Sequence, residues 1–130
     1  MGNGVDEKPD RRVVRDVSIS ALEDLVESPP RATVAFTEGG TADILPALAC
    51  CTAGTYQFGV VSDTALDLDH REVVLVIDAG SNSWFKLRGF SVRGVAVRVQ
   101  PPTSDGADLT WYAIEPRRIL AWDYGAIREE

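Results

Sequence analysis

Arginine side chains are the residues of this chain best suited to bind a phosphate or a carboxylate, because the guanidinium fork donates two parallel hydrogen bonds. Arg31 opens the first predicted strand, and others recur along the later ones. Most strand arginines are simply solvated, so this pattern alone does not single out a ligand site. The arginines near predicted strands are Arg31, Arg88, Arg93, Arg98, Arg117 and Arg118.

Three tryptophans, Trp84, Trp111 and Trp122, have indole rings that can stack on a flat ring system. Packing in a core or an interface explains a strand tryptophan at least as well. The tryptophans are therefore compatible with a planar ligand without requiring one.

Acid–base and metal chemistry have less support. Asp63, Asp67 and Asp69 lie in one polar stretch, where mutual repulsion and solvation are expected rather than a tuned pair or a magnesium site. The single histidine, His70, lies in the same stretch, and we expect it to be solvated. No Gly-x-Ser-x-Gly elbow or phosphate-binding glycine loop is present. The sequence names no catalytic residue and predicts no metal.

Cys50 and Cys51 are adjacent, and neighbouring strand residues point to opposite faces. A disulfide between them would require a distorted backbone. We predict two reduced thiols that take no part in catalysis.

Composition narrows the class of protein. The chain has 130 residues, with 45% hydrophobic and 25% charged, which is typical of one globular domain. A net charge of -7 opposes binding to nucleic acid. The longest apolar run, residues 73–77, is too short to span a membrane, and the first residues are unlike a secretory signal. We expect a cytoplasmic protein with neither nucleic acid nor membrane as partner.

The chain divides into a polar tail, residues 1–15, and a domain, residues 16–130. Ser20 and Glu23 have the spacing of a capping box, which predicts a short helix. Pro29 and the proline after it should end this helix.

Short runs rich in Val, Ile, Thr and aromatic residues follow, separated by Gly, Asn, Asp and Pro, which is typical of antiparallel β structure. Residues 72–78 are apolar on both faces, so a helix or a second subunit should cover the outer one. Gly94 should bend the fifth strand, and Pro116 should interrupt the sixth. The six predicted strands are residues 32–37, 42–50, 55–61, 72–78, 84–99 and 109–122.

The order of these parts resembles the pyridoxamine 5'-phosphate oxidase-like family. The resemblance is carried by residues 31–40 (RATVAFTEGG), 46–48 (PAL), 72–78 (EVVLVID), 87–89 (LRG), 92–96 (VRGVA) and 114–125 (IEPRRILAWDYG). It covers roughly residues 18–128. It implies a mainly β fold, a six-stranded antiparallel split β-barrel with one or two short helices, that forms a homodimer.

The resemblance also implies a cofactor, FMN, a deazaflavin or sometimes haem, at the dimer interface. In the family pattern, Arg31 is a candidate for the flavin phosphate, and residues 46–48 and 59–62 would line the ring. The expected cofactor-binding residues are Arg31, Pro46, Ala47, Leu48, Gly59, Val60, Val61, Ser62, Asp63, Thr64, Arg88 and Trp122.

One departure from the family pattern affects the expected affinity. Many flavin-binding members carry a basic pair after the third strand, where this chain has Ser62, Asp63 and Thr64. An acidic residue repels a phosphate, so we expect weak binding of FMN. The resemblance favours an FMN- or deazaflavin-dependent oxidoreductase that transfers a hydride to a flat conjugated small molecule. The alternative is a cofactor-free ligand-binding or accessory protein.

Overall fold

The computed structural model describes residues 17–52, 54–62, 66–80, 87–103 and 108–124. The 3-10 helix η2 (Ile19–Leu22) and the short helix α1 (Glu23–Glu27) precede the sheet. The described strands are β1 (Ala32–Glu38), β2 (Thr41–Thr52), β3 (Thr55–Val61), β4 (Glu72–Asp78), β5 (Arg88–Val99) and β6 (Leu109–Asp123).

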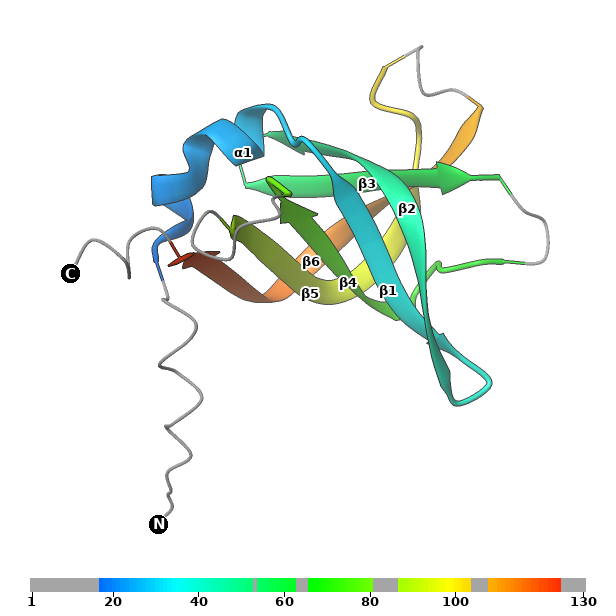
Figure 1. The fold of residues 1–130 in the computed structure, drawn as a ribbon. Helices are drawn as coiled ribbons and strands as arrows, with labels where there is room; N and C mark the ends of the chain where they lie inside the picture. Colours follow the sequence, from blue (N-terminus) through cyan, green and yellow to red (C-terminus); the bar gives the residue numbers. More distant parts are fainter. Residues whose placement is uncertain (1–16, 53, 63–65, 81–86, 104–107, 125–130) are drawn as a thin grey trace.

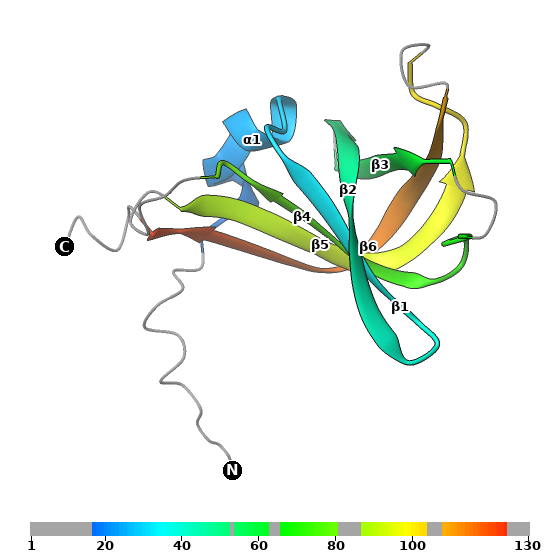
Figure 2. The same ribbon diagram turned by 45° about the vertical axis from the view of Figure 1, so that its right-hand side comes forward.

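These strands form one closed barrel in the order β1-β2-β3-β6-β5-β4, with every neighbouring pair antiparallel (Figures 1 and 2). Side chains alternate between the interior and the outer surface, as the pleat of a strand requires. The fold class predicted from the sequence is confirmed. Fully buried residues from five of the strands fill the interior, among them Val34, Phe58, Leu75, Ile77, Phe90 and Tyr112.

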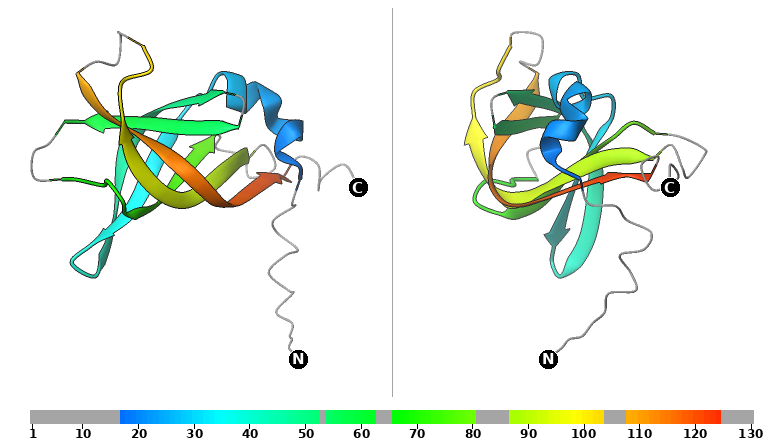
Figure 3. Two further views of the ribbon diagram at one scale, coloured as in Figure 1. Left: turned by 180° about the vertical axis from the view of Figure 1, so that it is seen from behind. Right: turned by 90° about the vertical axis from the view of Figure 1, so that its left-hand side faces the viewer.

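The entry helices cover one end of the barrel (Figure 3). The predicted capping box was wrong by two residues, because Ser18 caps the first turn: its Oγ accepts a hydrogen bond from the Ser20 amide at 3.2 Å. The tight 3-10 turn then points Leu22 into the core, where it is 0% exposed, and Leu25 of α1 follows it. Burial of these leucines holds the helices on the barrel.

Strand β6 runs without a break through Pro116, where the sequence predicted an interruption. Gly94 pairs with Pro116 and Arg93 with Arg118, so Arg117 is an extra residue opposite the β5 strand. This β-bulge accommodates Pro116, which has no backbone N–H to donate to the neighbouring strand. A Cβ at Gly94 would collide with the Glu115 carbonyl, so only glycine fits there.

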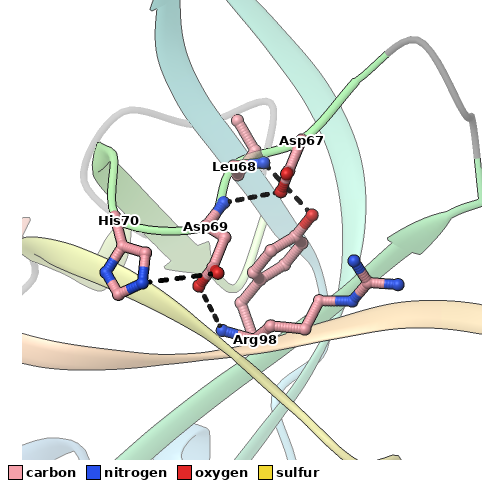
Figure 4. Close-up of polar contacts among 6 residues, drawn as sticks. Asp67, Leu68, Asp69, His70 and Arg98 are labelled. Atoms are coloured by element: carbon pink, nitrogen blue, oxygen red, sulfur yellow. Dashed lines mark hydrogen bonds and ion pairs between the residues drawn. The ribbon is translucent and has the colours of Figure 1, made fainter.

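Residues 66–71, the plug loop, close the barrel end where β3 terminates and β6 begins (Figure 4). Leu68 is 0% exposed within the core, and its amide donates to the Tyr112 hydroxyl at 3.2 Å. Asp69 Oδ1 accepts the backbone N–H of Arg98 at 2.8 Å, and the Asp69 amide donates to Asp67 Oδ1. The plug loop is therefore held by polar contacts to both long strands.

No helix among the described residues is long and apolar enough to cross a membrane. The predicted tail, residues 1–15, and the first residues of the predicted fifth strand, 84–86, lie outside the described residues.

Replacing Tyr112 with phenylalanine should destabilise the fold, because the buried Leu68 amide then loses its acceptor. The expected loss in the free energy of unfolding is about 1–3 kcal/mol. Tyr56→Phe is the matched control: this ring is also buried, and no described residue is hydrogen-bonded to its hydroxyl. Urea unfolding measures both variants. Equal losses would show that the plug contact contributes nothing.

Candidate functional site

An apolar patch on the outer surface of β2 and β3 is the main candidate for a ligand site. It consists of Ile44, Pro46, Leu48 and Val61, and we call it the β2–β3 face. Ile44 is 66% exposed, Leu48 55% and Val61 76%. Large apolar side chains this exposed are a common mark of a binding or subunit surface when they are grouped together. A hollow of about 170 Å³ lies beside Pro46 and Val61.

Strand alternation divides the residues that the sequence predicted to line a ring. Pro46 and Leu48 point outward, while Ala47 between them packs against the core. In the same way Val61 is exposed, and Val60 is 4% exposed inside the barrel. The side chains of Ala47 and Val60 therefore have no access to a ligand on the outer face. Asp63 and Thr64 lie outside the described residues.

Gly59 leaves room for an indole ring on the outer face. Its partner across the ladder is Trp111 of β6, and a Cβ at Gly59 would lie 2.6 Å from Trp111 Cε2. The Trp111 ring, 3% exposed, is not part of the barrel core. It packs over the glycine, so its own exposed area is too small to stack on a ligand.

A polar pocket lies at the rim of the barrel, where β3 ends and β6 begins. Its volume is about 610 Å³. Ser62 Oγ lies 3.0 Å from Thr110 Oγ1 and donates to the Asp108 carbonyl at 3.2 Å. Arg98 of β5 also lines this rim pocket. Nothing in the sequence separates Arg98 from the other strand arginines; only barrel closure brings it beside Ser62.

Arg31, Arg88 and Trp122, three of the predicted site residues, line a different pocket of about 330 Å³, which shares no residue with the rim pocket. Arg31 Nε lies 3.5 Å from Asp78 Oδ1. Its guanidinium charge is balanced by this carboxylate.

Arg88 has more carboxylate contacts than Arg31, and these contacts join helix α1 to the barrel. Its two terminal nitrogens donate to the Asp24 carboxylate of α1 at 2.8 and 3.1 Å, and its Nε lies 3.8 Å from Asp123. The hydrogen bonds from Arg88 lower the pKa of the Asp24 carboxyl. This arginine therefore has carboxylate partners on two elements.

Several solved structures share this architecture at low sequence identity. An FAD-binding protein from Mycobacterium smegmatis has 20% identity and a TM-score of 0.65, over 82% of this chain and 95% of that one. A conserved hypothetical protein from Mycobacterium tuberculosis has 20% identity and a TM-score of 0.66, over 92% and 91%. A candidate pyridoxamine 5'-phosphate oxidase from Corynebacterium glutamicum has 19% identity and a TM-score of 0.60, over 83% and 95%.

The chain has the pyridoxamine 5'-phosphate oxidase-like split-barrel fold. No protein-family model and no curated protein matches it by sequence. The likeness is therefore one of fold, and the roles of this split barrel's residues must be argued from its own geometry.

The acidic stretch of this split barrel has a structural role. Asp67 and Asp69 accept backbone hydrogen bonds within the plug loop and from β5. His70 has an exposed side chain 3.5 Å from Asp69, and its amide donates to the Ala96 carbonyl at 2.7 Å. The described residues contain no group of three or more His, Cys, Asp or Glu side chains placed to hold a metal ion.

Cys50 and Cys51 are both free, and alternation separates them. Cys50 is half-buried, while Cys51 is buried beside Tyr56 in the core. Burial raises the pKa of the Cys51 thiol to about 11. The thiolate is the reactive form of cysteine, so Cys51 is chemically protected at neutral pH.

A thiol-reactive disulfide reagent at about pH 8 should therefore modify Cys50 quickly and Cys51 slowly, because the raised pKa disfavours the Cys51 thiolate. Cys50→Ala should remove the fast phase, and Cys51→Ala the slow one. Denaturant should make both thiols react at once. Two equal rates in the folded protein would contradict the protection of Cys51.

Proposed function

We propose that this protein is a flavin-dependent oxidoreductase that holds FMN against the β2–β3 face of a homodimer. The observation that supports this most is the group of exposed apolar side chains on that face. Proteins of the same fold include ones named as FAD-binding, from Mycobacterium smegmatis and Mesorhizobium loti. A cofactor site combines an apolar surface with a few polar groups that set orientation.

The residues present fit a flat ring with a polar tail. Leu48 and Val61 offer apolar contact, and the hollow beside Pro46 adds depth. Ser62, the next residue after Val61, contributes a hydroxyl at the rim where β3 ends, beside Thr110. A bound flavin, FMN or a deazaflavin, supplies hydride transfer to or from a flat conjugated small molecule. The chain itself orients the ring and excludes water from it.

Weak binding is part of the proposal. Arg31 and Arg88, the two phosphate donors expected from the sequence, have the carboxylates of Asp78, Asp24 and Asp123 as partners. A phosphate would have to compete with these carboxylates for each guanidinium. Bound FMN should therefore dissociate easily and be lost during purification.

A homodimer follows from the same exposed face. A protein surface with grouped apolar side chains is commonly covered by a partner, and identical chains most often pair about a twofold axis. We propose that a second copy covers part of the β2–β3 face and closes the ligand site. The two free thiols of β2, Cys50 and Cys51, are consistent with a cytoplasmic protein.

Titration of FMN into the full chain should give a dissociation constant on the order of micromolar or weaker. Leu48→Glu should weaken binding at least about tenfold, because a carboxylate then lies on the apolar face and repels the phosphate. Leu120→Glu, on β6 and outside this face, is the matched control and should bind as the wild type does. Quenching of FMN fluorescence measures all three.

Two results would contradict the flavin proposal. Equal effects of the two glutamate substitutions would remove the β2–β3 face as the site. Failure of the wild type to bind FMN, FAD, a deazaflavin or haem, followed by visible spectra, would favour a cofactor-free ligand-binding or accessory protein.

Light scattering at micromolar concentration should report twice the chain mass of 14.1 kDa. Leu48→Glu should shift the protein towards the monomer, since burying an unpaired carboxylate in an interface is costly. Leu120→Glu should stay dimeric. A monodisperse wild-type monomer would overturn the dimer, while the titration above would still decide the flavin site.

A further inference from the structure

Strand β6 extends beyond β3 and leaves part of one edge unpaired. Its pairing with β3 begins at Leu109 and ends at Ile114, whereas its pairing with β5 continues to Asp123. Among the described residues, no strand pairs with β6 beyond Ile114 on the β3 side. Figure 3 shows β6 running on past β3 towards the entry helices. An open edge of this kind can pair with an added strand.

The backbone groups of Ile119 point to the open side. The Ala121 carbonyl accepts the Val17 amide of the entry segment at 3.3 Å, so it points away from β5. The Tyr124 amide donates to the Leu87 carbonyl at 2.9 Å, on the β5 side. Both backbone groups of a residue in an antiparallel strand point to one side, and the side alternates along the strand. Ile119, two residues before Ala121 in a regular stretch of the ladder, therefore presents its N–H and C=O at the open edge.

The side chains along this edge are accessible as well. All residues from Glu115 to Leu120 are exposed, and we call residues 115–120 the β6 edge. Ile119 and Leu120 point to opposite faces of the strand and are 36% and 37% exposed. The β6 edge begins beyond the Tyr56 end of β3, whereas Val61 of the β2–β3 face lies at the other end. The two surfaces are therefore separate.

The β6 edge concentrates positive charge in an acidic protein. Arg117 and Arg118 lie on it, and Arg93 of β5 is directly opposite Arg118 in the ladder. Like charges directly opposite each other destabilise a sheet. No described carboxylate lies within ion-pair distance of any of these arginines, and Glu115 is the one acidic residue of residues 115–120. In a chain of net charge -7, this arrangement favours an acidic partner.

The same charges disfavour a second copy of this chain as the occupant. A twofold axis that paired the β6 edge with itself would bring the arginines of both copies together. Natural sheets use charged side chains and proline to prevent such self-pairing. Pro116 removes one N–H, but the N–H and C=O of Ile119 remain at the open side. Charge complementarity therefore favours a different chain that carries acidic side chains.

We propose that the β6 edge docks an extended acidic segment of another protein, which adds a strand to the sheet. The added strand pairs with Ile119 through backbone hydrogen bonds, and its side chain opposite Ile119 points to the same face as Ile119. The two flanking side chains then lie on the face of Arg93 and Arg118. The segment therefore alternates apolar and acidic residues, with the period of a strand. This docking is independent of the proposed flavin binding.

A synthetic peptide tests the backbone pairing. The probe is an eight-residue peptide of alternating valine and glutamate with blocked ends, titrated into the full chain by calorimetry. With valine opposite Ile119, the valine amides face β6 and the glutamate amides face solvent. N-methylation of the valine amides should weaken binding at least about tenfold, and N-methylation of the glutamate amides, the matched control, should change it little. Equal effects of the two modifications would rule out strand addition.

Two charge-reversal variants test the acidic character of the partner. Arg118→Glu should weaken binding of the valine–glutamate peptide at least about tenfold, because like charges then meet. The same change should raise the midpoint of thermal unfolding, because a glutamate opposite Arg93 replaces a like-charge pair. Arg98→Glu, at an exposed arginine of β5 outside the β6 edge, is the matched control and should bind as the wild type does. Equal losses in both variants would contradict docking at this edge.

Amide hydrogen exchange distinguishes the possible occupants. The Ile119 amide should exchange rapidly in the full chain alone, at any protein concentration, and slowly once the valine–glutamate peptide is added. Slow exchange without peptide would mean that another part of this chain or a second copy already covers the edge, and the proposal would be wrong. Failure of the wild type to bind this peptide at millimolar concentration would also overturn it, whatever the FMN titration gives.

Discussion

Successive side chains of a β-strand point to opposite faces, and closure of the barrel gives those two faces different environments. Phe58 and Val60 lie in the core, whereas their neighbours face outward: Val61 is exposed, and Gly59 lies beneath the Trp111 ring. A slip of one residue in the register of β3 would exchange the two sets and bury the candidate site. The register of this strand therefore decides both stability and ligand access.

The plug loop links the core to the rim. Leu68 completes the apolar interior, and the neighbouring Asp69 accepts the amide of Arg98. One short segment thus closes the barrel and anchors the arginine that lines the rim pocket. The entry helices at the other end of the barrel also combine these two roles. Leu22 is buried in the core, and Asp24, two residues later, pairs with Arg88.

Arg31 and Arg88 have carboxylate partners, whereas Arg98, which lines the rim pocket, has none within ion-pair distance among the described residues. Arg88 joins α1 to the barrel through Asp24, and this pair lowers the pKa of that carboxyl. Arg31 lies beside Asp78 at the end of β4. Exposed ion pairs of this kind contribute little to stability, but they do occupy the guanidinium. Arg31 and Arg88 are of a residue type that suits phosphate binding, but their neighbouring carboxylates compete with a phosphate.

The sequence by itself determined the strands, because alternating apolar residues bounded by turn residues specify them: β3 and β4 have the bounds that the pattern predicts. The split-barrel topology came from the order of motifs that resembles a known family. The local pattern failed at the helix cap, because the 3-10 helix that buries Leu22 begins at Ile19 and is capped by Ser18. Only the tertiary structure showed that Pro46 faces outward while Ala47 packs against the core, and that Arg98 lies beside Ser62. Which side chains share a pocket depends on strand register and barrel closure. Both arise from contacts between residues far apart in the chain.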